Sequence, residues 1–178
     1  MHGVYDPVPF NLATILSNPP LDWSNLLDHP NTKRLASLNQ VIKKIKQYVD
    51  AEWIGIYRKV VVDSVPNLVK EAYTGSPSRA LFPLTEEFAE SSNNSWVGIQ
   101  GKGKLIQDIR DYNGPYYECN GAVLSELCVP IFNKDNQIIG IIDIESHKAN
   151  FFSTIHLIYI SQMCVELGKI ALGNEIEK

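Results

Sequence analysis

The 178-residue sequence contains no apolar stretch of the roughly 18 residues that a membrane-spanning helix needs, so we expect no membrane segment. It also lacks a basic run: 16 Lys and Arg residues stand against 20 Asp and Glu residues, which gives a formal net charge of -4. This balance argues against a nucleic-acid-binding surface. The first seven residues have neither the basic nor the apolar segment of a secretory signal, and we expect no such signal there.

Cysteine is scarce in this chain. Its three cysteines, Cys119, Cys128 and Cys164, form no C-x-x-C pair, and the four histidines are scattered without metal-binding spacing. We therefore predict no metal site. An odd and sparse set of cysteines indicates free thiols in a reducing cytosol, so we expect a cytoplasmic protein.

Hydrophobic residues make up 44% of the chain, which is enough for one globular domain with its own core. Residues 1–31 differ from the rest because they are rich in Pro and Asn, and prolines interrupt any long helix or strand there. We predict that residues 1–31 form an N-terminal arm that packs over the domain. Residues 32–175 are predicted to form that single domain.

The hydrophobic pattern predicts a long helix near each end of the domain. Residues 32–50 carry apolar side chains at steps of three and four, with Thr32 as the expected N-cap. Residues 153–172 carry a second apolar face, with Ser153 as the cap. A short helix is expected at residues 95–100, and the polar stretch 85–94 is either a loop or a frayed helical turn.

The segments between the two long helices are rich in β-branched residues and predict strands joined mostly by hairpins. Hairpin-linked strands indicate an antiparallel sheet with helices grouped on it, which is the α+β class. The predicted strands are 53–62, 68–73, 80–84, 104–108, one that ends at 132, and 138–146.

Three acidic residues lie in the last predicted hairpin, whose strands are joined by a turn at residues 133–137. Side chains alternate along a strand, so Asp143 and Glu145 point to the same face. A two-residue loop at 134–135 would place Glu126 opposite Asp143, and a loop at 135–136 would place it opposite Glu145. Both registers gather the three acids on one face, whereas an odd loop would separate them.

Facing acids destabilise a sheet by about 0.2–1 kcal/mol, so this arrangement requires a reason. One explanation is a site where a cation binds, or where one acid stays protonated because its pKa is raised. The other is a solvent-exposed strand face whose acids meet Lys or Arg from elsewhere. The sequence alone leaves both explanations open.

Two aromatic residues flank a glycine in the first predicted strand. Trp53, Gly55 and Tyr57 share one strand face, so the glycine leaves a gap between two large rings. The rings could form a pocket wall for an apolar or cationic group. They could equally be core residues, with glycine at a close approach of the backbone.

Cys119 differs from the other two cysteines in its setting. It precedes Asn120 and Gly121, a turn pair that often exposes its neighbours, so its thiol is expected to be accessible. Cys128 falls within a predicted strand and Cys164 within the last helix. Both are predicted to be packing residues.

The segments W-I-G-I-Y at 53–57, E-C-N-G at 118–121, S-E-L-C-V-P-I at 125–131 and G-I-I-D-I-E at 140–145 resemble the GAF domain. Within GAF domains they are similar to the stand-alone enzymes that reduce free methionine-(R)-sulfoxide. The resemblance covers roughly residues 33–172. It implies a GAF-like α+β fold, with a central antiparallel sheet and the N- and C-terminal helices packed on one face. It implies no cofactor.

The resemblance also implies roles for the pocket residues. Glu126, Asp143 and Glu145 fall where the family's acids bind the substrate amino group and assist the loss of oxygen. Trp53 and Tyr57 fall where aromatic residues form the wall of the substrate pocket. The expected ligand is therefore free methionine sulfoxide or a similar amino acid.

Catalysis is implied by the same resemblance. Cys119 falls at the nucleophile, with Asp143 and Glu126 as the acids that assist it, and its attack would leave a sulfenic acid. The family's other cysteines are replaced by Val97 and Leu81. An external thiol, such as a thioredoxin-type reductant, would then resolve the sulfenic acid. The alternative is a non-catalytic GAF sensor, and the apolar first and last helices suggest a homodimer in either case.

Overall fold

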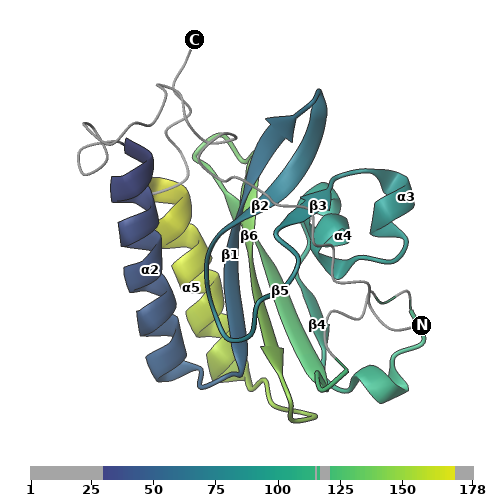
Figure 1. Ribbon diagram of the computed structural model, residues 1–178. Helices are drawn as coiled ribbons and strands as arrows, with labels where there is room; N and C mark the ends of the chain where they lie inside the picture. Colours follow the sequence, from purple (N-terminus) through teal and green to yellow (C-terminus); the bar gives the residue numbers. More distant parts are fainter. Residues whose placement is uncertain (1–29, 115, 117–120, 171–178) are drawn as a thin grey trace.

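A six-stranded antiparallel sheet forms the centre of the protein, in a computed structural model that describes residues 30–114, 116 and 121–170 (Figure 1). The strands lie in the order β3-β2-β1-β6-β5-β4, and every neighbouring pair is antiparallel. The strands are β1 (Trp53–Val62), β2 (Val65–Thr74), β3 (Leu81–Pro83), β4 (Lys104–Ile106), β5 (Ser125–Phe132) and β6 (Ile138–Ser146).

Helices cover both faces of this sheet. The two long helices, α2 (Pro30–Tyr48) and α5 (Thr154–Ile170), lie side by side on one face (Figure 1). The shorter helices α3 (Glu86–Ala89) and α4 (Asn93–Gln100) lie on the other face, and a 3-10 turn, η1 (Ile109–Asp111), follows β4. The predicted α+β fold, with the two long helices on one face, is confirmed. None of the helices that the structure describes has the length and apolar character needed to span a membrane.

Several predicted boundaries were wrong, and side-chain caps explain two of them. The first long helix already includes Pro30, so Thr32 lies within its first turn instead of capping it. Helix α4 begins at Asn93, two residues early, because the Ser92 hydroxyl accepts a hydrogen bond from the Ser95 N–H at 3.2 Å. Strand β4 ends at Ile106, and the Asp108 carboxylate then caps η1.

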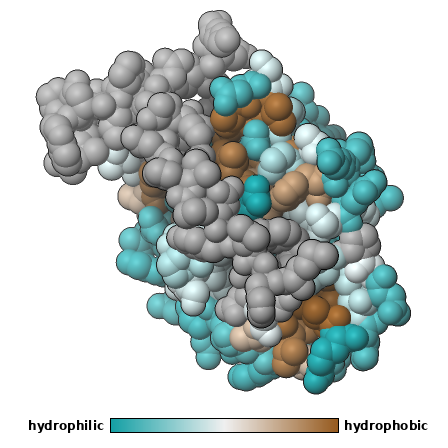
Figure 2. Space-filling model, turned by 45° about the vertical axis from the view of Figure 1, so that its right-hand side comes forward, coloured by the Kyte–Doolittle hydropathy of each residue, from teal (hydrophilic) through white to brown (hydrophobic). Residues whose placement is uncertain are grey.

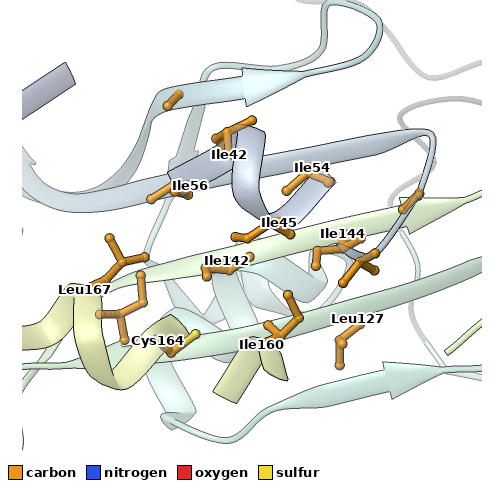
Figure 3. Close-up of a cluster of buried hydrophobic side chains, with 14 of the residues drawn as sticks. Ile42, Ile45, Ile54, Ile56, Leu127, Ile142, Ile144, Ile160, Cys164 and Leu167 are labelled. Atoms are coloured by element: carbon orange, nitrogen blue, oxygen red, sulfur yellow. The ribbon is translucent and has the colours of Figure 1, made fainter. Parts of the chain in front are cut away.

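The main hydrophobic core lies between the sheet and the two long helices. Figure 3 shows Ile42 and Ile45 of α2 meeting Ile54 and Ile56 of β1, with strands β5 and β6 and helix α5 completing the cluster. The Cys164 side chain projects into this cluster, so its prediction as a packing residue is confirmed. Burial raises the pKa of its thiol.

A buried ion-pair cluster ties α2 to the sheet on the same side. The Glu71 carboxylate in β2 is fully buried and accepts hydrogen bonds from Arg34 Nη2 at 3.0 Å and Arg58 Nε at 2.8 Å. Two cations satisfy the one carboxylate, which offsets the cost of taking its charge out of water.

The turn between β5 and β6 has an odd number of residues, yet the acids share a face. Five residues separate Phe132 from its partner Ile138, and Asn136 adopts a positive φ of 59° in this turn. The pairing then shifts by one residue, because Ile131 faces Gly140 and Ile139 forms a bulge. The bulge compensates for the odd loop, so Glu126 faces Glu145, the second of the two predicted registers.

The opposite face of the sheet carries a second, smaller core. Trp53 and Tyr57 of β1 belong to it, together with residues of β2, β3, β5, β6 and α4. The Trp53 indole lies across Gly55, because a Cβ built at Gly55 would come within 2.6 Å of Trp53 Cζ3 and closer still to Cη2. The space that Gly55 was predicted to leave beside the aromatic residues is thus filled by the Trp53 indole itself.

We predict that Gly55→Ala displaces the Trp53 indole and destabilises the fold by about 1–3 kcal/mol, because the added methyl overlaps the ring. Urea unfolding monitored by tryptophan fluorescence would measure both effects. Gly103→Ala is the matched control, since a Cβ there meets its nearest atom at 3.6 Å. Equal stability of the two variants would contradict this account of Gly55.

Candidate functional site

Three carboxylates gather on the face of the sheet that is covered by α4. Glu126 of β5 faces Glu145 of β6, and Asp143 lies next on β6, opposite Cys128. Glu126 is 5% exposed, Glu145 is 8% exposed and Asp143 is 2% exposed. The prediction that the acids share a face is confirmed, and the alternative of a solvent-exposed acidic strand is wrong.

The hydrogen bonds to these carboxylates are incomplete. Asp143 Oδ2 accepts a hydrogen bond from Asn94 Nδ2 at 3.0 Å, but Asp143 Oδ1 has no partner among the described residues. The Asn93 side chain and the Tyr116 hydroxyl both lie close enough to Glu126 to lower its pKa by hydrogen bonding. No hydrogen bond to the Glu145 carboxylate is found in the described part of the chain. A buried oxygen without a donor is costly, so the cluster has unused capacity to accept hydrogen bonds.

Burial raises the pKa of all three carboxyl groups, since it disfavours their charged forms. The negative charge of Glu126 adds to this effect at Asp143 and Glu145. The pKa of Glu145 reaches about 8 as a result. Burial together with the three carboxylates also raises the pKa of the Tyr116 hydroxyl, which therefore stays protonated as a donor. The cluster holds protons at neutral pH unless a cation replaces them.

Two lysines flank the acid cluster on either side. Lys70 lowers the pKa of Glu145, and its Nζ donates to the Ser78 carbonyl at 2.7 Å. Lys104 lowers the pKa of Glu126, and its Nζ donates to Asn93 Oδ1 at 3.0 Å. Their positive charge offsets part of the repulsion between the acids but does not cancel the upward pKa shifts.

The two aromatic residues predicted to form a pocket wall lie at different depths. The Trp53 indole Nε1 donates to the Ser76 carbonyl at 3.0 Å, which fixes the ring at the edge of the site. Tyr57 is 1% exposed, and its ring centroid lies 6.2 Å from that of Trp53 and 5.5 Å from that of Phe82. Trp53 lies at the wall of a cavity, whereas Tyr57 is buried in the small core behind the Trp53 ring.

Two small cavities adjoin the acids. One, of about 10 Å³, lies among Asn94, Asp143 and the two glutamates and is large enough for one water molecule at most. The other, of about 130 Å³, is lined by Trp53, Glu145, Glu52, His147 and the loop at residues 76–78. Figure 2 shows separate hydrophobic patches between hydrophilic surface on the face of the molecule that it presents.

A larger hollow of about 800 Å³ lies elsewhere, between α5 and the edge of the sheet. Its lining is mostly apolar and includes Leu105, Val129, Phe132, Leu157 and Val165. None of the three acids lines it. No group of His, Cys, Asp and Glu suited to a metal ion occurs within the described residues.

Sequence reasoning missed several members of the site, and Cys119, its predicted nucleophile, lies outside the described residues. Cys128 was predicted to be a packing residue; it is buried, but its Sγ lies 3.5 Å from Asn94 Oδ1 beside Asp143. Strand alternation contained this signal, because residues 126 and 128 share a face. Burial raises the pKa of the Cys128 thiol, so it is protonated. Asn94 and Tyr116 carry no comparable signal, since other segments bring them to the acids.

Comparison with known proteins identifies the fold independently. The sequence model of the GAF domain matches residues 34–171. The chain is 25% identical over 130 residues to GAF domain-containing protein A of Dictyostelium discoideum, covering 73% of this chain and 76% of that protein. It is 28% identical over 120 residues to protein YtsP of Bacillus subtilis, covering 67% and 68% of the two chains.

Solved structures agree with this fold. A type II free methionine-R-sulfoxide reductase from Thermoplasma acidophilum matches with a TM-score of 0.67 at 19% identity, over 78% of this chain and 92% of that one. The free methionine-R-sulfoxide reductase from Neisseria meningitidis, in complex with its substrate, matches with a TM-score of 0.62 at 18% identity, over 82% and 87%. At these identities the likeness shows the fold alone. Together with the match over residues 34–171, it shows that the chain belongs to the GAF domain family.

Proposed function

We propose that this protein binds a small ligand with a positively charged amino group at Glu126, Asp143 and Glu145, and that free methionine-(R)-sulfoxide is this ligand. The observation that carries the proposal is the buried acid cluster, in which Asp143 Oδ1 and the Glu145 carboxylate lack hydrogen-bond donors among the described residues. An ammonium group brings three donors and one positive charge. Such a group would donate hydrogen bonds to the carboxylate oxygens that lack them, and its charge would offset the repulsion between the acids.

The choice of ligand is supported by the fold and by the Trp53 indole. Two free methionine-R-sulfoxide reductases share the fold, although their identity to this chain is below 25%. Trp53 provides an apolar surface at the edge of the acid cluster, suited to the aliphatic part of an amino acid. A ligand with an ammonium group and a short apolar chain fits both parts.

We further propose that Cys119 reduces the bound sulfoxide. Its thiolate would attack the sulfoxide sulfur while a protonated carboxyl group of the cluster donates to the sulfoxide oxygen. Burial raises the pKa of Asp143 and of Glu126, which favours the protonated form that this step needs. The oxygen would end on Cys119 as a sulfenic acid, leaving free methionine. An external dithiol would then release it as water and become a disulfide.

A second candidate function is ligand binding without turnover, as in a sensor domain. It is favoured by the side chains at two positions where the resemblance places cysteines. Val97 is a fully buried member of the small core, and Leu81 lies in the short edge strand β3. Neither can form a disulfide with Cys119, so catalytic recycling would depend entirely on the external thiol.

Binding of a cationic ligand should strengthen as the pH rises towards 8. An ionised Glu145 attracts an ammonium group, and its raised pKa of about 8 means that it carries a proton at lower pH. The same direction follows for Asp143 and Glu126, whose pKa values are also raised. Affinity for methionine-(R)-sulfoxide should fall by up to about tenfold per pH unit below 8, the limit for exchange of one proton.

Isothermal titration calorimetry between pH 6 and pH 8, in two buffers of different ionisation enthalpy, would measure this effect. Proton release on binding is expected in the wild type and should decrease in Glu145→Gln. A pH-independent affinity in the wild type would contradict the role of these acids.

Turnover and binding can be separated with two further variants. Asp143→Asn should weaken binding of methionine-(R)-sulfoxide about tenfold or more, since an amide cannot ionise to meet the ligand's ammonium group as the Asp143 carboxyl group can. Cys119→Ser should retain binding and lose reduction in an assay with dithiothreitol or thioredoxin. Asp135→Asn, in the exposed β5–β6 turn, is the control for loss of an acid and should leave both properties unchanged. Wild-type binding without turnover would support the sensor function, and no binding at all would refute the proposal.

A further inference from the structure

We propose that the cavity of about 130 Å³ beside Glu145 is the chamber that receives the ligand, and that Glu52 at its edge is a second carboxylate that selects for an amino group. This inference rests on the proposed function, which it extends by locating the ligand and adding a residue to its recognition. The expected occupant is a small aliphatic amine, or the amino end of an amino acid.

The two cavities next to the acids differ in volume. The cavity at Asp143 measures about 10 Å³, and the Tyr116 hydroxyl already donates to the neighbouring Glu126. The chamber is more than ten times larger and approaches the roughly 150 Å³ of a protein cavity that binds benzene. A ligand in the chamber therefore does not have to displace Tyr116.

Glu145 connects the chamber to the acid cluster, because it lines both cavities. It is 8% exposed, and the described residues offer its carboxylate no hydrogen bond. A nearly buried carboxylate at the wall of a cavity is a strong acceptor for a cationic group. Glu145 thus places at the chamber wall a carboxylate that has no hydrogen-bond donor among the described residues, where the ligand's ammonium would lie.

Glu52 lies just before β1 and is held in a fixed position. Its Oε2 accepts hydrogen bonds from the Ser146 hydroxyl at 2.8 Å and from the His147 N–H at 3.0 Å. Partial burial acts to raise the pKa of Glu52, but these hydrogen bonds outweigh it and the net pKa is lowered. Glu52 is therefore ionised at neutral pH and adds a permanent negative charge to the chamber wall.

The Trp53 indole completes the recognition surface. Its Nε1 donates to Ser76, and its ring lies across Gly55, so the indole cannot turn freely. Lys70 Nζ already lies 5.7 Å from the centroid of the Trp53 ring, so the indole offers the ligand an apolar edge beside the two carboxylates. Two carboxylates and an indole around one cavity form a suitable environment for a primary or methylated ammonium group.

Two variants and two probes test the chamber. Glu52→Gln keeps an oxygen for Ser146 and His147 but removes the charge, and Ser78→Phe adds bulk to the 76–78 loop that lines the chamber. Glu87→Gln, on the exposed side of α3, is the matched control. The probes are methylammonium chloride, which is small enough for the chamber, and L-methionine-(R)-sulfoxide. Circular dichroism verifies that each variant folds.

In the wild type, methylammonium should shift the indole N–H resonance of Trp53, assigned with Trp53→Phe, in two-dimensional NMR spectra. Glu52→Gln should weaken the sulfoxide's affinity about fivefold to tenfold and Ser78→Phe should weaken it further, whereas Glu87→Gln should not change it. Glu52→Gln should also reduce the preference for the sulfoxide over its deaminated analogue. A purely structural role of Glu52 would lower both affinities equally and overturn the assignment.

The outcomes separate this inference from the proposed function. Sulfoxide binding that is lost in Asp143→Asn but unchanged in Glu52→Gln and Ser78→Phe would overturn the chamber and leave the proposed function intact. A Trp53 shift with methylammonium, without sulfoxide binding, would support the chamber and refute the proposed ligand. Failure of both probes in the wild type would overturn both.

Discussion

The pairing of β5 with β6 is the constraint on which the site depends. It places Glu126 opposite Glu145 and Asp143 beside them, on a face that α4 then buries. Buried like charges are unfavourable, so the cluster must hold protons or a cation. The bulge at Ile139 is essential to this arrangement, because the odd loop would otherwise turn one strand's acids to the opposite face. Local features that cost stability are often found at functional sites, which supports the proposed role of the acids.

The two faces of the sheet differ in chemistry, and the proposed function places ligand recognition on only one of them. On one face, α2 and α5 bury an almost continuous aliphatic core, and Glu71 ties α2 to the strands through two arginines (Figures 1 and 3). Burial of this aliphatic core stabilises the fold and so offsets the cost of burying a polar cluster on the other face. The second face is aromatic and polar, with Trp53 fixed across Gly55. A rigid indole next to carboxylates is a preorganised surface, which reduces the entropy lost on binding.

Proton and ligand compete for the same acids in the proposed function. A carboxyl group with a raised pKa can donate a proton to a sulfoxide oxygen, and its ionised form can hold an ammonium group. Glu145, with a pKa of about 8, is balanced between these states near neutral pH. Tyr116 lies beside Glu126, whereas the proposed chamber lies beside Glu52 and Glu145, so a ligand in the chamber would not have to displace Tyr116.

The predicted homodimer and the predicted N-terminal arm stay predictions.

The sequence by itself determined the α+β class, most strands and the shared face of Asp143 and Glu145, because these follow from local periodicity. It also predicted the Trp53–Gly55 arrangement in outline. Tertiary structure decided the rest. The burial of the acids depends on α4, the register depends on a bulge that no local pattern specifies, and Asn94 and Tyr116 reach the acids from distant segments. Glu52 joins the site through hydrogen bonds to residues more than ninety positions away. Contacts over such separations are set by the packing of the whole sheet, so the sequence could not show them.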